Sequence, residues 1–401
     1  MKFSLRSLLG TAAFLLVAVI ITLSVINFVS IPLPGGGVIL SARDYNSLKE
    51  LNKFIRVKTF LDSHYYRDTD PAALEEGAIR GMLEALEDPY TVYMDKDEYD
   101  SFMTHTTGTY EGIGLVVEGG EDGYIRVVAP IEDTPSARAG IRTADRIIRV
   151  DGQEVYADQL ERAVAMMKGP EGTEVVLTIM REGLSDPFDV NIVREEIRLV
   201  TVKSEVIEDN IGYVRISAFD EKTDEDFRTQ IKRLQGEGIQ GLILDLRGNP
   251  GGLLDVVVRV ADFIMGKGLI VYTEDRQGNR NEELSDDGEL GLPLVVLVDG
   301  GSASASEILA GAIQDSETGI LVGTRTFGKA LVQTIQGLGD GSAIKMTIAQ
   351  YYTPKGRSIQ GSGIQPDYVV ERPDDAVIGD YSEGKDTQLA EALELIKNIP
   401  D

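Results

Sequence analysis

One stretch near the amino terminus constrains this chain more than any other. Residues Leu8–Val29 are almost entirely apolar, and no charged residue occurs between Arg6 and Arg43. These 22 residues, at about 1.5 Å each in a helix, span roughly 33 Å and can cross the ~30 Å hydrocarbon core of a bilayer. A signal peptide has a shorter apolar region, of about 7–15 residues, and an A-x-A-like cleavage site. The sequence therefore favours an uncleaved transmembrane anchor, with a cleaved signal peptide as the alternative.

The charges around this stretch predict its orientation. Lys2 and Arg6 precede it and no acidic residue does, which favours an amino terminus inside the cytoplasm. Everything after about residue 30 is then expected on the periplasmic or extracellular side of a bacterial cytoplasmic membrane, or secreted if the segment is cleaved. The whole chain has 39 basic and 66 acidic residues. This acid excess argues against a nucleic-acid partner, which requires a basic surface.

Cysteine is absent from the chain, and the two histidines are His64 and His105. The lack of cysteine excludes a thiol nucleophile, a cysteine-liganded zinc site and an iron–sulfur cluster. No metal-binding motif surrounds either histidine, so neither a metal nor a cofactor is expected. A Ser-His-Asp hydrolase needs a histidine near its serine, and residues 106–401 contain none. A hydrolase in this larger part must therefore use another general base.

The spacing of apolar residues divides the chain into parts. Residues 31–38 form a breaker-rich linker, and residues from about 43 to 103 have helical spacing. Residues 108–195 contain short β-rich runs with one obvious helix, Ala157–Lys168. From about residue 196, apolar strand runs alternate with helices, which indicates an α/β core. The helices expected there are Asp224–Leu234, Leu253–Met265, Ser304–Gln314 and a final one, Thr387–Lys397.

A serine-rich turn is the first candidate for chemistry. The segment GGSASASEILAGAIQ, Gly300–Gln314, follows the apolar run PLVVLVD. A strand, a turn of small residues and a helix start can expose a serine beside free helix N–H groups, which suit a developing oxyanion. The alternative is a purely structural helix cap, because Ser304 and Glu307 have capping-box spacing.

Lys329 ends the segment GTRTFGK, which matches the first part of a phosphate-binding loop. Ala330 stands where that loop needs a Ser or Thr hydroxyl, and the following residues favour a strand over a helix, so a nucleotide site is disfavoured. Apolar neighbours instead favour the neutral amine of Lys329, which could take a proton from a serine. An ordinary solvated lysine is the alternative.

Two glycine-rich segments complete the set. In LDLRGNPGGLL, Leu244–Leu254, the glycines would let the backbone approach a ligand and point an N–H group at it. In GIGL, Gly112–Leu115, a glycine-flanked turn before a strand could capture a terminal carboxylate while the strand edge pairs with an added peptide. A tight turn without function is the alternative for both.

Together these segments resemble the carboxyl-terminal processing proteases, serine peptidases with a Ser–Lys dyad and an inserted PDZ domain. GIGL followed by SARAGIRTADRIIRVDG is similar to such a PDZ domain. LDLRGNPGGLL, SASASEILAGA, TFGKALVQ and YYTPKGRSIQGSGIQPD are similar to the core motifs, in the family's order. We therefore expect an α/β multidomain protein: a transmembrane anchor (1–30), a linker and helical region (31–103), a β-rich PDZ domain (104–195), a mixed α/β protease core (196–372), and a C-terminal tail with a helix (373–401).

The resemblance also implies a role for individual residues. Ser304 would be the nucleophile, Lys329, 25 residues later, the general base, and Gln333 the residue that orients the lysine. The N–H groups of Gly252 and Ala305 would form the oxyanion hole, with Gly251 as the alternative to Gly252. The PDZ residues expected to receive the C terminus of a substrate are Ile113, Gly114, Leu115, Leu160 and Val164.

The function that follows is a membrane-anchored serine endopeptidase outside the cytoplasm. It would select proteins by an apolar C-terminal tail, bind that tail in its PDZ domain, and cleave through an acyl-enzyme without a metal or cofactor. The resemblance also allows a homo-oligomer and an adaptor protein as partners. The alternative is a PDZ-containing adaptor or scaffold whose core is catalytically silent.

Overall fold

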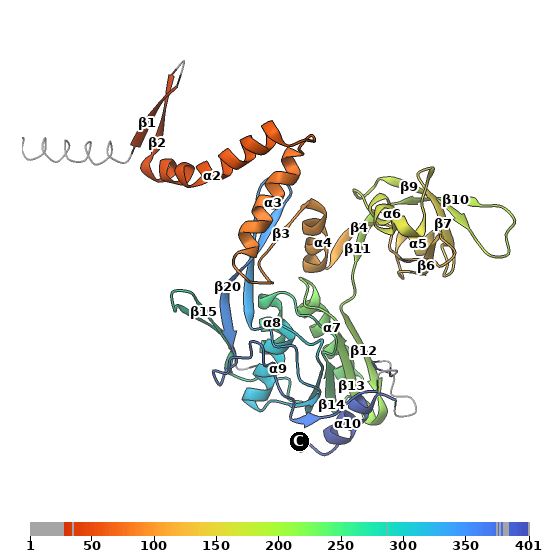
Figure 1. Cartoon of the computed structure of the whole chain (residues 1–401). Helices are drawn as coiled ribbons and strands as arrows, with labels where there is room; N and C mark the ends of the chain where they lie inside the picture. The colour runs from red at the N-terminus through yellow and green to blue at the C-terminus, as the bar shows by residue number, and fades with distance from the viewer. Residues whose placement is uncertain are drawn as a thin grey trace, which may run out of the picture. The chain divides into compact units, whose positions relative to one another are not determined.

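The computed structural model describes residues 28–33, 36–286, 288–373, 376, 378–379 and 385–399 (Figure 1). It contains two compact units, Met1–Glu87 and Asp88–Asp401. The predicted anchor Leu8–Val29 lies outside the described residues except for its last two. Among the helices that are described, none has both the length and the apolar character needed to cross a bilayer.

The first unit begins with a hairpin. Strands β1 (Phe28–Leu33) and β2 (Gly36–Ser41) pair antiparallel, and the described residues of the predicted linker, 31–38, belong to these two strands. A two-stranded ribbon has free edges and therefore tolerates proline, as at Pro32 opposite Gly37. Helices α2 (Ala42–His64) and α3 (Pro71–Glu84) follow. Asp70 caps α3 by accepting the N–H groups of Ala72 and Ala73.

The predicted helical region also contains a strand. Helix α4 (Lys96–Thr107) agrees with it, but β3 (Val92–Met94) is a strand that pairs with β20 (Ala343–Tyr352). The partner of β3 lies far along the chain, and local periodicity carries no information about such a partner. This pairing brings residues 88–92 into the neighbourhood of the protease core.

The β-rich module is an antiparallel sheet with strand order β10-β9-β7-β6-β5. Its core includes the fully buried side chains of Ile125, Val127 and Ile147. The short β4 (Thr109–Gly112) and β11 (Glu195–Arg198), which enter and leave the module, pair with each other. The remaining elements are β5 (Leu115–Gly119), β6 (Ile125–Pro130), β7 (Arg146–Val150), β8 (Gln153–Glu154), β9 (Glu174–Met180), β10 (Phe188–Val193), α5 (Pro135–Arg138), the 3₁₀ turn η1 (Ala157–Gln159) and α6 (Leu160–Met167). The predicted helix Ala157–Lys168 corresponds to η1 and α6.

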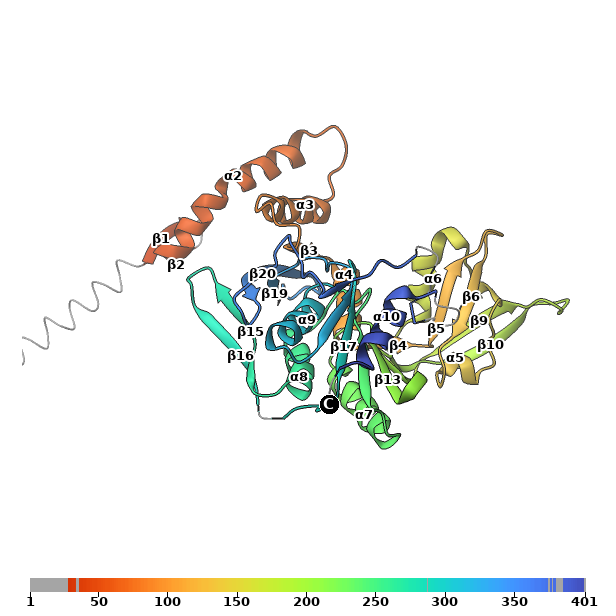
Figure 2. The same ribbon diagram turned by 90° about the horizontal axis from the view of Figure 1, so that it is seen from below.

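The larger core is built on a mostly parallel sheet with strand order β12-β13-β14-β17-β18-β21, in which only β12 is antiparallel to its neighbour. Helices α8 and α9 lie side by side on one face, and α10 packs against the other (Figure 2). The strands are continuous apolar runs because both faces are covered. Their bounds are β12 (Val202–Ile207), β13 (Ile211–Ile216), β14 (Gly241–Asp245), β17 (Leu294–Val298), β18 (Ile320–Gly323) and β21 (Tyr368–Val369), and the helices are α7 (Thr223–Gly236), α8 (Leu254–Ile264), α9 (Ala305–Ser316) and α10 (Thr387–Ile396).

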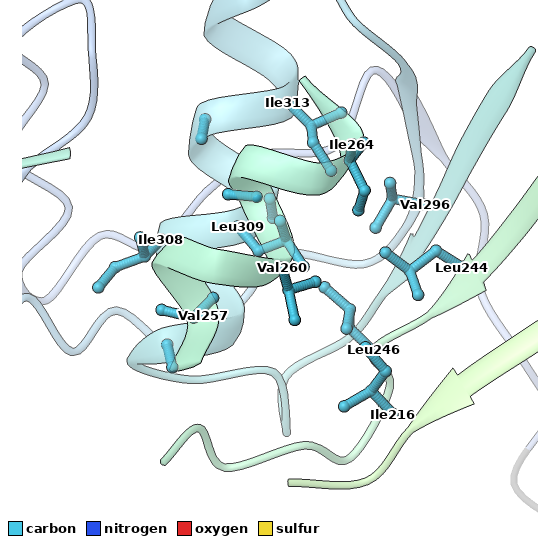
Figure 3. Close-up of a cluster of buried hydrophobic side chains, with 14 of the residues drawn as sticks. Ile216, Leu244, Leu246, Val257, Val260, Ile264, Val296, Ile308, Leu309 and Ile313 are labelled. Atoms are coloured by element: carbon cyan, nitrogen blue, oxygen red, sulfur yellow. The ribbon is translucent and has the colours of Figure 1, made fainter. Parts of the chain in front are cut away.

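Side chains from the sheet and from the two helices interdigitate beneath the turns that follow β14 and β17. Leu244 and Val296 extend from the sheet toward Val260 of α8, and Ile313 of α9 lies near Ile264 (Figure 3). All five are fully buried. Close-packed protein interiors deform little. The core beneath the turns at the carboxyl ends of β14 and β17 is therefore expected to hold these turns rigidly.

A second sheet, ordered β16-β15-β20-β19, lies within the same unit. It contains β15 (Gly268–Asp275), β16 (Arg280–Ser285), β19 (Leu331–Gly337) and β20. The residues after Lys329 therefore form a strand, as predicted, and β20 pairs with it in antiparallel register.

A buried ion-pair network fastens the last helix to the core. The guanidinium group of Arg247, which is completely buried, donates to Asp245 at the end of β14 and to Asp386, the N-cap of α10. Tyr213 donates its hydroxyl to the same Asp245. Arg247 directly precedes the glycine-rich turn, so this network anchors the turn from below.

Candidate active site

The turn between β17 and α9 holds Ser304 in an unusual conformation. Its backbone has φ 54° and ψ −113°, outside the regions that L-residues favour. Such strain costs about 1–3 kcal/mol and persists where the surroundings impose it, often at functional sites. The neighbouring serines differ, because Ser302 and Ser306 are fully buried and donate to the carbonyl oxygens of Leu246 and Asn249, 2.8 and 2.9 Å away. Ser304 is half-buried, so its position distinguishes it from both.

The glycine-rich turn after β14 packs directly against Ser304. A Cβ atom placed on Gly251 would lie 2.8 Å from the Cβ of Ser304 and 2.9 Å from the nitrogen of Ala305. The N–H of Gly251 donates to Oδ1 of Asn249, 2.8 Å away. Within the described part of the chain, the N–H groups of Gly252 and Ala305 have no recorded acceptor. Gly251 is buried whereas Gly252 is exposed, which favours Gly252 as a donor to a bound molecule.

Lys329 lies half-buried in the loop between β18 and β19. Its Nζ is 4.7 Å from the centre of the Tyr90 ring. Burial, and after it the charge of Lys345, lowers the pKa of Lys329, while Asp88 and Glu307 act in the opposite direction. No hydrogen bond between its Nζ and the Ser304 hydroxyl is recorded among the described residues. Catalytic hydrogen bonds are often long before substrate binds.

Gln333 on β19 does not contact Lys329 through a recorded hydrogen bond. Its amide donates instead to the carbonyl oxygen of Leu331, 3.3 Å away. The structure therefore brings Ser304, Ala305 and the glycine turn together, and it holds the Gln333 amide on the main chain of its own strand.

Glu307 connects the serine and lysine segments. Its carboxylate is completely buried. One oxygen, Oε2, accepts the N–H groups of Ser304 and Lys329 at 3.0 and 2.8 Å. The other, Oε1, accepts the N–H of Gly328 at 2.7 Å and the hydroxyl of Thr326 at 2.6 Å. The loop N–H groups that would cradle a phosphate are thus already occupied, which agrees with the rejection of a nucleotide site.

The β-rich module contains a small apolar cavity of about 180 Å³ between β5 and α6. Four of the five residues predicted to receive a peptide line it: Ile113, Gly114, Leu115 and Val164. Leu160 does not, because it lies one helical turn before Val164 at the start of α6. The cavity also has four walls that the sequence reasoning missed, namely Tyr110, Val117, Met167 and Lys168.

The turn at the mouth of this cavity is held by side-chain hydroxyls. Gly114 has φ 76°, and its carbonyl oxygen accepts the hydroxyls of Thr134 and Ser136. A Cβ atom on Gly114 would lie 2.3 Å from Thr134, so glycine is required there. The conformation of this loop is therefore fixed by Gly114 and by the hydroxyls that hold its carbonyl oxygen.

Comparison with known proteins identifies the family. Residues 39–98 match the N-terminal domain of the activating protease CtpB, residues 126–181 a PDZ domain, and residues 210–370 peptidase family S41. A carboxy-terminal-processing protease of Bartonella bacilliformis is 42% identical over 363 residues, which cover 88% of this chain and 82% of that protein. The chain belongs to the carboxy-terminal processing proteases of peptidase family S41. It is therefore a serine-type endopeptidase with a PDZ domain and a mixed α/β protease core.

A second relative and a solved structure are also similar to this chain. The protease CtpA of Bacillus subtilis is 37% identical over 359 residues, covering 89% of this chain and 77% of that protein. The solved structure of a putative S41 protease from Bacteroides fragilis is 16% identical, covers 84% of this chain and 92% of that chain, and has a TM-score of 0.51. That structure shows that the fold is shared.

Several residues around the site of this protease were not found by sequence reasoning. Glu307 was recognised only as the capping-box partner of Ser304, and Asp88, Tyr90 and Tyr351 were not singled out as site residues. They come from three parts of the chain: Glu307 from α9, Tyr351 from β20, and Asp88 and Tyr90 from the segment before β3. The only sequence signal among them was the capping-box spacing of Glu307. Local patterns cannot indicate a contact that depends on how distant strands pair.

Proposed function

We propose that this protease cleaves proteins selected by an apolar C-terminal tail, through an acyl-enzyme on Ser304 with Lys329 as the general base. The main support is the strained, half-buried Ser304, which packs against a glycine turn beside the N–H groups of Gly252 and Ala305. The lowered pKa of Lys329 supports the second role, because a base must be neutral to accept a proton.

The chemistry proceeds in two halves. The amine of Lys329 takes the proton of the Ser304 hydroxyl as Oγ attacks the scissile carbonyl, and the resulting oxyanion accepts the N–H groups of Gly252 and Ala305. Lys329 then gives its proton to the leaving amine, which departs and leaves an ester on Ser304. A water molecule gives a proton to Lys329 as it attacks this ester. The ester bond then breaks, the acid product leaves, and Lys329 returns the proton to the Ser304 oxygen. We assign Gln333 to orient the lysine once substrate is bound.

The PDZ cavity would recruit the tail before cleavage. PDZ domains bind the C termini of proteins as an added strand, with the terminal side chain in a pocket. The cavity walls Ile113, Leu115, Val164 and Met167 are apolar, so we infer that it takes an apolar terminal residue. We keep Leu160 as a contact to residues farther from the terminus, since it precedes the cavity along α6.

Changing Val164 to Asp should weaken the tail selection. A carboxylate inside an apolar cavity is costly to desolvate and repels a terminal carboxylate, so KM for an unfolded protein with an apolar tail should rise about tenfold or more. Cleavage of a short peptide that lacks such a tail should not change. Ala165→Asp is the matched control, because Ala165 is exposed. Equal KM values of the unaltered protease for apolar and acidic tails would contradict the proposal.

We also propose that Leu8–Val29 anchors the protease in the bacterial cytoplasmic membrane with the catalytic part outside. The length and apolarity of the segment support this. The full chain should remain in the membrane fraction after an alkaline wash, whereas a chain that begins at residue 31 should be soluble. External proteinase should reach residues of the catalytic part in spheroplasts. A mature protein whose amino terminus follows the apolar segment would instead establish a cleaved signal peptide.

Two further partners stay predictions. Helix α2 exposes the apolar side chains of Leu51, Phe54, Ile55 and Phe60, a surface compatible with a second copy of the chain. No described residue points to an adaptor protein.

A further inference from the structure

The carboxylate of Glu307 is shared by the main chains of the two proposed catalytic residues. The N–H groups of Ser304 and Lys329 meet at a single oxygen, Oε2, at 3.0 and 2.8 Å. A helix cap needs only the first of these bonds. Hydrogen bonds to a carboxylate are about twice as strong as neutral ones, and a buried carboxylate requires them because burial without partners is costly. The arrangement therefore fixes the distance between the two main chains.

A second buried group contacts the same two residues. It is a donor to their carbonyl oxygens, whereas Glu307 accepts their N–H groups. The hydroxyl of Tyr351, on β20, lies 3.0 Å from the carbonyl oxygen of Ser304 and 2.6 Å from that of Lys329. Tyr351 is 1% exposed, and its own N–H donates to the carbonyl oxygen of Ala330. Its single proton can satisfy one carbonyl at a time, so the hydroxyl lies between the two and bonds to either.

We propose that Glu307 and Tyr351 form a clamp that holds the main chains of Ser304 and Lys329 at the separation that proton transfer requires. Glu307 accepts both N–H groups at one oxygen, and Tyr351 donates its proton to one carbonyl oxygen or the other, so both residues are positioning residues. The clamp also explains how the strained backbone of Ser304 is maintained. This inference rests on the proposed Ser304–Lys329 dyad.

The clamp has an electrostatic consequence that ordinary packing does not share. Three charged groups act on Lys329: Asp88 before β3, Lys345 on β20 and Glu307 on α9. Two tyrosines also face it, Tyr90 with its ring beside Nζ and Tyr351 with its hydroxyl at the carbonyl oxygen. The negative charge of Glu307 raises the pKa of Lys329. Removing that charge should lower the pKa, so the neutral amine would persist to lower pH even while the rate falls.

The test compares Glu307→Gln and Tyr351→Phe with Glu317→Gln and Tyr352→Phe in the same chain. Glu317 is an exposed residue at the end of α9, and Tyr352 is the next residue on β20, stacked on Tyr272. Because a misplacement of about 1 Å can cost roughly 100-fold in rate, both clamp variants should lose about 100-fold in kcat with little change in KM for a short peptide. The acidic limb of the kcat profile should move to lower pH for Glu307→Gln and stay in place for Tyr351→Phe.

The controls should retain the kcat and the pH profile of the unaltered protease. A kcat close to the control value for a folded Glu307→Gln and for Tyr351→Phe would overturn the clamp. If Glu307→Gln does not fold, Tyr351→Phe decides alone, because it keeps the buried ring and removes only the hydroxyl. Failure of the dyad itself is distinguishable, since it would appear as activity in Ser304→Ala.

Discussion

Replacing Ser304 by glycine should abolish proteolysis and at the same time raise the midpoint of thermal unfolding. The nucleophile is lost in Ser304→Gly as in Ser304→Ala, and removal of a catalytic serine can cost about 10⁶-fold in kcat. Only glycine relieves the backbone strain at φ 54° and ψ −113°, because alanine keeps the Cβ atom that causes it. Glycine also gives the unfolded chain more conformational entropy, which offsets part of this relief. We therefore expect the free energy of unfolding to rise by about 1 kcal/mol.

The measurement is a calorimetric or fluorescence melt alongside cleavage of an unfolded substrate. Ser306→Gly is the matched control, because Ser306 lies two residues further on, inside α9, where glycine weakens a helix. It should therefore lower the melting temperature, as Ser304→Gly raises it. Cleavage by Ser304→Ala at the rate of the unaltered protease would show that another residue is the nucleophile.

Replacing Lys329 by methionine should eliminate cleavage at every pH, whereas replacing Lys345 by methionine should only shift the pH profile. Methionine keeps the length and apolar packing of the lysine stem but cannot accept a proton, and loss of a general base costs about 10²- to 10⁴-fold. The charge of Lys345 lowers the pKa of Lys329. Without that charge the pKa rises, more of the base is protonated at neutral pH, and the acidic limb of kcat/KM moves to higher pH.

This comparison requires kcat/KM for one short peptide from neutral to alkaline pH. Lys345→Met should be slower than the unaltered protease near neutrality and should regain its rate as pH rises. The kcat/KM of Lys329→Met should not rise as the pH becomes alkaline. An acidic limb that moves downward in Lys345→Met, or a measurable limb in Lys329→Met, would rule out Lys329 as the titrating base.

The sequence predicts those parts of the fold that depend on local pattern. Buried strands such as β14 and β17 are recognisable because they are unbroken apolar runs, and α8 and α9 because their apolar residues recur at helical spacing. The strand β3 and the hairpin β1–β2 were not predicted. Their identity depends on a partner strand, and for β3 that partner is β20.

The residues of the candidate site that stand in short motifs were predicted, whereas the contacts between distant segments were not. Ser304, Lys329 and the glycine pair stand in short motifs whose composition indicates chemistry, and these were found. The contrast between Gly251 and Gly252 depends on the side chain of Asn249, which accepts the N–H of Gly251. The shared oxygen of Glu307 depends on a loop more than twenty residues away in sequence. Such contacts arise only when several elements have packed, so no single segment encodes them.

The ion pair between Arg247 and Asp386 sets an order of events for a newly made chain. Arg247 leads into the turn of Gly251 and Gly252, but its partner belongs to the N-cap of the last helix. During synthesis the guanidinium group has Asp245 beside it from the start, but its bonds to Asp386 must wait until almost the whole chain has emerged. Burying it alone would be costly. The network beneath the turn of Gly251 and Gly252 is thus complete only when the N-cap of the last helix has docked.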